Sequence, residues 1–190
     1  MRTPDHAIDP LILRRHSPRA MSGAPLPQEE LDRLFEAARW APSSGNMQPW
    51  RFVVARRDTP AFTDFHNLLL GFNQDWTSRA AALVVVCGQT QRVAHDGSVK
   101  PARLYAFDTG AAWMALALQG TAQGLVVHAM EGFDNIKAKD VVKAPEGIDV
   151  LCMVAIGLPG DPALLPEDKR KGEAPNAREP ITKHVLMNHF

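Results

Sequence analysis

The chain has 190 residues, of which 45% are hydrophobic and 22% are charged. Lysine and arginine together number 21, as do aspartate and glutamate, so the formal net charge is zero and gives no electrostatic reason to expect binding to nucleic acid or to an anionic membrane. A chain of this length is expected to form one domain, residues 1–190, whose core needs neither disulfides nor metal ions.

The amino-terminal residues MRTPDHAIDP carry charges and prolines but no apolar stretch, so a signal peptide is not expected. No segment has the length of a membrane span. The two cysteines, Cys87 and Cys152, lie in apolar runs typical of buried strands and suggest no disulfide framework. We therefore expect a cytoplasmic protein with no membrane or nucleic-acid partner.

The predicted elements begin, in chain order, with a short helix from Asp9 to Arg14, which Pro18 stops. The run PLPQEELDRLFEAARWAP predicts a second helix, with Pro27 at its first position, acidic residues in its first turn and Pro42 at its end. A loop with the sequence SSGNMQ follows and leads into a strand from Trp50 to Ala55.

A third helix is predicted from Thr59 to Leu70, and a polar stretch around FNQDW connects it to a buried strand from Leu83 to Cys87. The polar segment QTQRVAHDGSVKP, residues 89–101, is predicted to be a loop. A long alanine-rich helix is predicted from Leu104 to Gln123, with Gly124 as its stop signal. The small residues of this helix would let another backbone approach closely.

A short apolar segment from Leu125 to His128 leads into MEGFD, and the last predicted strand runs from Val150 to Ile156. After Gly157 the chain is rich in proline and charge, so this tail is expected to be disordered or to lie along another surface. A few strands separated by helices, without regular β-α-β alternation, indicate an α+β fold.

Four segments contain residues that can bind a ligand, although each alone has a simpler structural explanation. The segment RRHSPR offers three guanidiniums and a hydroxyl that can grip a phosphate, or it is a solvated helix cap. The loop APSSGNMQPW, residues 41–50, offers amides for a heterocycle edge, or it is a connection. Gly132 would permit close approach of a flat ligand, or Asp134 beside it caps a helix. The fourth segment is the tail with Arg178.

Together and in this order, these segments resemble the nitroreductase family of FMN-dependent oxidoreductases. RRHSPR is similar to the family's Arg-Arg-Ser/His motif, and APSSGNMQPW is similar to its Pro-Ser-Ser-x-Asn-x-Gln-Pro-Trp signature. FNQDW, AMEGFD and GLPG follow in the expected order, so the resemblance extends from Leu11 to about Val185. It implies a single FMN-binding domain with a central, mostly antiparallel sheet flanked by helices, and a C-terminal tail extending over the partner subunit.

The resemblance implies a phosphate site built from both ends of the chain. The amino-terminal residues that hold the phosphate and the ribityl chain are Arg14, Arg15, His16 and Ser17. Arg178 closes over the phosphate from the tail. Many relatives carry a basic residue two positions earlier, where this chain has Asn176, so that contact is either lost or supplied by Lys169, Arg170 or Lys171.

For the ring system, the resemblance implies that Arg19 lies near flavin N1, where a fixed cation favours the reduced anion. Asn73 is implied to bond the pyrimidine edge, and the backbone of Glu131 and Gly132 to approach N5 and O4. The loop residues that reach the cofactor from the partner subunit are Pro42, Ser43, Ser44, Asn46 and Gln48.

The resemblance also implies a homodimer, because a site that needs the Ser17 and Ser44 segments of different chains cannot form in a monomer. The implied reaction passes hydride from NAD(P)H through flavin N5 to a small organic oxidant, such as a nitroaromatic or quinone, in ping-pong order. It needs no side chain as nucleophile and no metal, and the seven scattered histidines show no metal motif. Two alternatives stay open: an enal or aldehyde reductase of the same fold, and a non-catalytic FMN-binding module.

Overall fold

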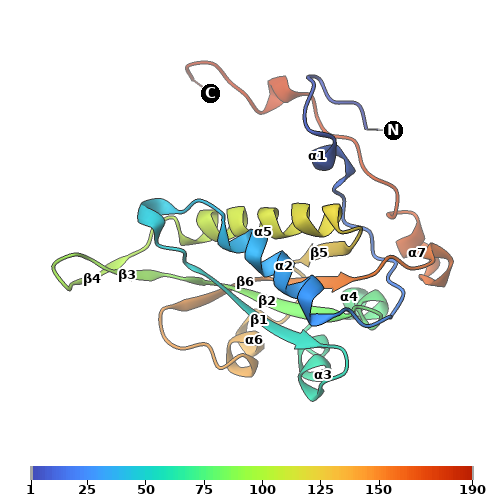
Figure 1. The fold of residues 1–190 in the computed structure, drawn as a ribbon, viewed down its shortest axis with the longest axis horizontal. Helices are drawn as coiled ribbons and strands as arrows, with labels where there is room; N and C mark the ends of the chain where they lie inside the picture. Colours follow the sequence, from blue (N-terminus) through green and yellow to red (C-terminus); the bar gives the residue numbers. More distant parts are fainter. Residues whose placement is uncertain (1, 190) are drawn as a thin grey trace.

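A computed structural model describes residues 2–189 and shows a four-stranded sheet between two layers of helices (Figure 1). The strand order is β1-β2-β6-β5, and every neighbouring pair is antiparallel. The strands are β1 (Trp50–Arg56), β2 (Ala82–Gln89), β5 (Val126–Met130) and β6 (Ile148–Gly157). The prediction of an α+β fold with a central antiparallel sheet is therefore confirmed.

One face of the sheet is covered by α2 (Gln28–Arg39) and α5 (Tyr105–Ala122), which pack against each other (Figure 1). Helix α2 buries Leu31, Leu34 and Ala38, because these residues recur on one side at helical spacing. Pro27 is the residue before this helix rather than its first residue, since its backbone is extended (ψ 147°). These contacts form the first of two hydrophobic cores, one on each face of the sheet.

The opposite face carries α3 (Pro60–His66) and α6 (Asn135–Val141), and α4 (Gly71–Thr77) lies at one end of the sheet (Figure 1). The prediction of one helix from Thr59 to Leu70 was too long, and the stretch FNQDW is helix α4 rather than a connection. The burial of Asn73, Trp76 and Thr77 on one side explains this helix, which the polar composition conceals. The side chain of Asp134 caps α6, as the simpler interpretation of that residue expected.

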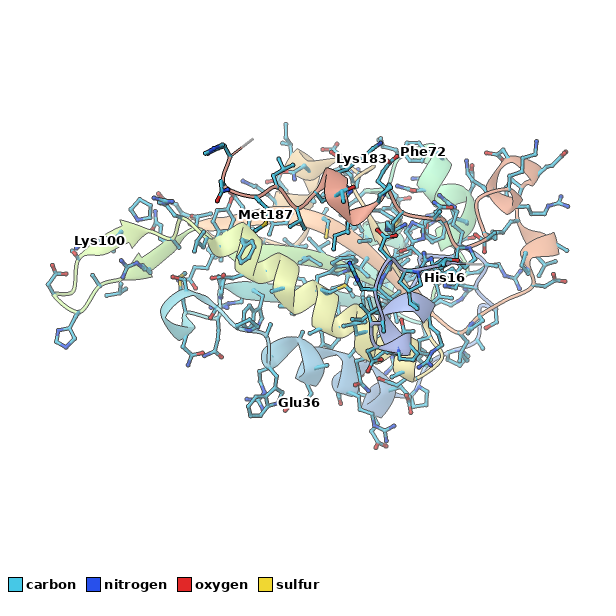
Figure 2. The ribbon with its side chains drawn as sticks, turned by 90° about the horizontal axis from the view of Figure 1, so that it is seen from above. His16, Glu36, Phe72, Lys100, Lys183 and Met187 are labelled. Carbon is cyan, nitrogen blue, oxygen red and sulfur yellow. The ribbon has the colours of Figure 1, made fainter. Side chains whose placement is uncertain are left out.

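Residues 89–101 contain a β-hairpin, so their prediction as a loop was wrong. The hairpin consists of β3 (Gln91–Val93) and β4 (Val99–Pro101) and projects from the body of the protein, with Lys100 near its tip (Figures 1 and 2). All residues of both strands are exposed, so no alternation of buried and exposed residues marks them in the sequence. Its turn uses Gly97 at a φ of 78°, a conformation that favours glycine.

The amino-terminal segment with α1 (Pro10–Arg14) runs beside the C-terminal tail, and both extend away from the sheet (Figure 1). The backbone nitrogen of Ile181 donates a hydrogen bond to the carboxylate of Asp5 (2.9 Å). The tail includes α7 (Glu167–Arg170), and all its described residues after Glu173 are exposed. The part of the tail after Glu173 therefore contributes nothing to the cores of its own protomer, whereas Leu165, earlier in the tail, is buried in one of them. No helix in the described part of the chain combines the length and apolar character needed to cross a bilayer.

Helix α5 packs closely against β5 at Gly120. A Cβ atom at this position would lie 2.4 Å from Cγ2 of Val127. Gly120→Ala is therefore expected to lower the free energy of unfolding by about 1–3 kcal/mol, because the added methyl group overpacks the core. Urea denaturation measures this effect. In a Val127→Ala background the space exists, so the cost of Gly120→Ala should largely vanish; equal costs in both backgrounds would exclude this explanation.

Candidate functional site

Arginine side chains from opposite ends of the chain meet beside α1. Arg15 caps the C-terminal end of α1, and Arg178 lies in the tail. The guanidinium of Arg2 donates hydrogen bonds to the carbonyl oxygens of Leu13 (3.0 Å) and Arg15, and to that of Asn176 (2.9 Å). Arg2 thereby ties the end of α1 to the tail.

The three guanidiniums of Arg2, Arg15 and Arg178 influence one another electrostatically. The pKa of Arg15 is lowered by burial first, then by the charges of Arg2 and Arg178, and the pKa of Arg2 is lowered by burial and by Arg178. Within residues 2–189, none of the three forms an ion pair with a carboxylate. Clustered cations without a counter-ion favour a multiply charged anion, so this arginine cluster fits the phosphate group of a cofactor.

The rest of the RRHSPR segment lies beside the arginine cluster. The guanidinium of Arg15 donates to the hydroxyl of Ser17 (3.1 Å), and Nδ1 of His16 lies 3.1 Å from the carbonyl oxygen of Arg14 (His16 is labelled in Figure 2). The structure thus brings the amino-terminal residues predicted for a phosphate site into one region with Arg178.

Arg2 belongs to this region but was missed by the sequence analysis. It is 174 residues from Asn176 in the chain, and no local motif connects the two. Two of the basic residues considered as substitutes at this position are engaged elsewhere: Lys169 pairs with Asp168 (2.6 Å), and Arg170 donates to the carbonyl oxygen of Leu165. Arg2, by contrast, contacts the backbone of Asn176 directly.

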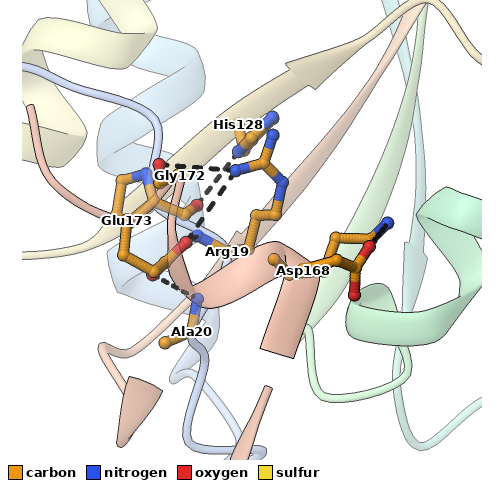
Figure 3. Close-up of polar contacts among 8 residues, drawn as sticks. Arg19, Ala20, His128, Asp168, Gly172 and Glu173 are labelled. Atoms are coloured by element: carbon orange, nitrogen blue, oxygen red, sulfur yellow. Dashed lines mark hydrogen bonds and ion pairs between the residues drawn. The ribbon is translucent and has the colours of Figure 1, made fainter. Parts of the chain in front are cut away.

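A second polar region lies where the chain enters the body at Arg19 (Figure 3). The carboxylate of Glu173, from the tail, accepts hydrogen bonds from the backbone nitrogens of Arg19 (2.7 Å) and Ala20 (3.0 Å). It also lies 4.0 Å from the guanidinium of Arg19. His128 of β5 makes a ring-nitrogen contact with the carbonyl oxygen of Pro18 (3.0 Å), and its pKa is lowered chiefly by burial. Arg19 is therefore held in place with its charge partly countered.

Asn73 and Gly132 meet close to this region. The side-chain amide of Asn73, which is 7% exposed, donates to the carbonyl oxygen of Gly132 (3.0 Å). A Cβ atom on Gly132 would lie 2.4 Å from the ring of Phe72 and 2.8 Å from the side-chain nitrogen of Asn73, so α4 packs closely against the backbone here. Phe72 itself is 54% exposed and presents an aromatic ring that the sequence analysis did not identify (Figure 2). Glu131 precedes Gly132 directly after β5.

The loop around the short helix η1 (Ser44–Asn46) is anchored at the start of α5. The backbone nitrogen of Ser44 donates to the carboxylate of Asp108 (3.0 Å), which is 4% exposed. Asn46 and Gln48 have φ values of 53° and 51°, a conformation that non-glycine residues adopt rarely and that is enriched at binding sites. The predicted site residues whose side chains remain exposed in this loop are Pro42, Ser44, Asn46 and Gln48, while Ser43 is half-buried.

The arginine cluster and the Ser44 loop lie far apart within one protomer. Figure 1 shows α1 above one end of α5 and the η1 loop at the other end. Helix α5 has 18 residues and is therefore about 27 Å long. One protomer thus does not bring together the two groups of residues that the sequence analysis assigned to a single site.

Helix α5 is apolar on all sides, although only one side contacts the cores of its own protomer. Its buried residues are Asp108, Thr109, Ala112, Leu116, Ala117 and Gly120. The outward side carries Phe107, which is 76% exposed, together with Gly110, Ala111 and Met114. A helix that is hydrophobic all round is usually covered on all sides. The outward side of α5 therefore suits contact with another protein surface.

Metal ions and reactive thiols are two other common catalytic groups. No cluster of three or more His, Cys, Asp or Glu side chains suited to a metal ion occurs within residues 2–189. Burial raises the pKa of Cys87 and of Cys152 to about 11, so both thiols stay protonated at neutral pH and are poor nucleophiles.

The sequence matches the model of the Nitroreductase family over residues 12–68 and 59–158. A crystal structure described as an oxidoreductase containing FMN has a TM-score of 0.96 and 38% identity, covering 100% of this chain and 96% of that chain. An Archaeoglobus fulgidus protein with the assigned name NADH dehydrogenase/NAD(P)H nitroreductase is 30% identical over 163 residues, 80% of this chain and 84% of its own length. The CLA biosynthesis enone reductase of Lactiplantibacillus plantarum is 32% identical over 106 residues, 50% of this chain and 48% of its own.

Proposed function

Because this chain belongs to the nitroreductase family, we propose that it is an FMN-dependent oxidoreductase that passes hydride from NAD(P)H to a small organic oxidant, such as a nitroaromatic or a quinone. FMN, when bound, would supply the two-electron chemistry, and NAD(P)H and the oxidant would bind in turn, in ping-pong order. The observation that carries the proposal is the arginine cluster of Arg2, Arg15 and Arg178, whose charges have no carboxylate partner within residues 2–189.

The phosphate of FMN is assigned to the arginine cluster. Arg15 and Arg178 would form charge-assisted hydrogen bonds with it, which are about twice as strong as neutral ones. Arg14, His16 and Ser17 border the same region. Arg2 would supply the basic group that many relatives carry at the position of Asn176, since it already contacts that residue's carbonyl oxygen.

The ring system of FMN is assigned to the region around Arg19, on the same protomer. The side-chain nitrogen of Asn73 already donates to the carbonyl oxygen of Gly132. The side-chain oxygen of Asn73 would therefore accept a hydrogen bond from a ring N–H group of the flavin. Arg19 would place a cation near N1, and Glu173 would hold the backbone of Arg19 in position. The backbone of Glu131 and Gly132 would border N5 and O4.

The opposite wall of the site is assigned to the Pro42–Gln48 loop of the partner subunit, so the active protein would be a homodimer. Two observations support this assembly. The loop lies at the far end of α5 from the arginine cluster of its own protomer (Figure 1), and α5 has an uncovered apolar side. The exposed tail after Glu173 would extend over the partner.

A second candidate is a reductase of enals or aldehydes that uses the same cofactor site. It is favoured by the similarity to an enone reductase from Lactiplantibacillus plantarum over 106 residues. The two functions differ only in the oxidant, so the substrate and not the flavin site would distinguish them.

The direct test is the purified protein itself. It is expected to be yellow, to release FMN on denaturation, and to lose its flavin absorbance when NADH or NADPH is added without oxygen. Nitroaromatics, quinones and enals are then supplied one at a time, and the compound that restores the absorbance fastest identifies the oxidant class. A protein that does not take up FMN would contradict the proposal, and a yellow protein that NAD(P)H does not bleach would be a non-catalytic flavin-binding module.

A further inference from the structure

A cavity of about 550 Å³ lies between the η1 loop, the β3–β4 hairpin and the start of α5. This volume is within the range of pockets that hold small organic molecules. Ser44 belongs both to the wall of this cavity and to the loop assigned to the flavin of the partner subunit. A molecule in the cavity would therefore lie beside the proposed flavin site.

Two arginines line this cavity without a partner in the described structure. Arg92 lies on β3, and Arg103 lies between β4 and α5. Among residues 2–189, neither side chain forms an ion pair or a hydrogen bond that would neutralise or orient it. Arg51, close to the same loop, is instead engaged: it donates to the carbonyl oxygen of Gln48 (3.0 Å) and to the side chain of Gln89 (2.9 Å). The guanidiniums of Arg92 and Arg103 are thus available to a ligand.

The only carboxylate among the residues that line the cavity is already engaged. Asp108 is 4% exposed and accepts a hydrogen bond from the backbone nitrogen of Ser44. It therefore holds the loop rather than neutralising the arginines. The lining thus contains two arginines and one carboxylate that is already hydrogen-bonded, so the positive charge of the cavity favours an anionic group.

The remaining wall of the cavity is largely apolar. Met47, Leu104 and Tyr105 line it, and Leu104 is 45% exposed. The hydroxyl of Tyr105 donates to the carboxylate of Asp149 (2.8 Å), so Tyr105 contributes its ring to the wall rather than a free polar group. A cavity lined by both apolar side chains and two guanidiniums suits a flat molecule that carries a carboxylate.

We propose that this cavity binds a small aromatic or conjugated carboxylate, and that Arg92 and Arg103 make the enzyme prefer oxidants that carry a negative charge. This inference names the substrate class of the flavin site and so rests on the proposed function. Arg92 and Arg103 act as specificity-determining residues, since their guanidiniums bind the carboxylate while the apolar wall holds the ring.

The test uses 4-nitrobenzoate and 4-nitrobenzamide, which share a ring and a nitro group but differ in charge. Their dissociation constants are measured by calorimetry on the flavin-loaded, oxidised protein without NAD(P)H, and kcat/KM is measured separately. The variants are Arg92→Gln, Arg103→Gln and the double variant. Lys100→Gln is the matched control, because it removes one positive charge from the same hairpin but Lys100 pairs with Asp96 and does not line this cavity.

The double variant is expected to bind 4-nitrobenzoate about tenfold or more weakly, because it loses two charge-assisted hydrogen bonds. Binding of 4-nitrobenzamide should change less than about twofold in all variants, and Lys100→Gln should resemble the wild type. An equal change for both ligands, no change, or no binding of 4-nitrobenzoate by the wild type overturns the proposal.

Two further results separate the alternatives. A loss confined to NADPH, with unchanged selectivity between the two nitro compounds, overturns the proposal by assigning the arginines to the co-substrate. In the second result, NAD(P)H does not bleach the wild type, while the double variant still loses affinity for 4-nitrobenzoate and not for 4-nitrobenzamide. In that case the proposed function fails and the anion site stands.

Discussion

Replacing Arg15 or Arg178 by alanine is expected to raise the dissociation constant for FMN by about tenfold or more, since each substitution removes roughly 1.5–3 kcal/mol of charge-assisted hydrogen bonding. Arg2→Ala is expected to have an effect of similar direction, because Arg2 also holds α1 against the tail. The effect is measured by titrating the flavin-free protein with FMN and following the quenching of flavin fluorescence.

Arg33→Ala is a suitable control for these variants. Arg33 is an exposed arginine on α2 that pairs with Glu29 (2.5 Å) and Glu30 (3.0 Å), away from the arginine cluster. Its loss removes one positive charge from the protein and should leave FMN affinity unchanged. If FMN binds the Arg15→Ala and Arg178→Ala variants as tightly as the wild type, the phosphate is not held by these residues.

Placing a charge on the uncovered side of α5 is expected to break the dimer and, with it, the flavin site. Phe107 is 76% exposed in the protomer, so Phe107→Glu should leave the protomer folded. If a second copy covers this side, each copy loses about 2 kcal/mol of apolar burial and gains a buried charge, which should weaken the dimer by about a thousandfold or more. Sedimentation velocity and the flavin content of the purified protein measure both consequences.

Ile136→Glu provides the matched control for this experiment. Ile136 is 82% exposed on α6, which lies on the opposite face of the sheet from α5 (Figure 1). The same substitution there should leave a yellow dimer. A yellow, dimeric Phe107→Glu protein would show that this side of α5 does not form the interface.

The long elements of the fold could be predicted from the sequence because their residues carry strong local signals. The helices α2 and α5 were located by apolar spacing and by their stop residues, and Gly124 indeed has a φ of 71°. The buried strands β2 and β6 were located from continuous apolar runs. The observed ends of these two strands differ from the predicted ends by only one or two residues, which is typical of sequence-based boundaries.

The short helix α1 was predicted, but helix α4 and the β3–β4 hairpin were not, because tertiary contacts rather than local sequence stabilise them. Helix α4 buries only Asn73, Trp76 and Thr77, two of which are polar, so its pattern resembled a loop. The exposed strands β3 and β4 have no buried face to create an alternating pattern. The cavity beside this hairpin was therefore not foreseen either.

For the candidate site, the sequence indicated which segments could bind a cofactor, but not which of their residues lie close together in the structure. RRHSPR and the tail arginine were recognised by motif, and the structure places Arg15 and Arg178 in one cluster. Arg2 joins them through contacts with residues distant in the chain, which no local pattern reveals. For Gly132 the sequence left open the approach of a ligand or a helix cap at Asp134, but it did not show that α4 packs closely against this glycine.

Mixed dimers test most directly whether each flavin site combines the arginine cluster of one subunit with the Ser44 loop of the other. One subunit carries Arg15→Ala and Arg178→Ala, and the other carries Ser44→Trp, which fills the space beside an exposed loop residue. Each variant alone should lose FMN. The mixed dimer, isolated with two affinity tags, should regain one FMN per dimer, since one site carries every substitution and the other carries none. A mixed dimer without FMN would show instead that each site is built within a single subunit.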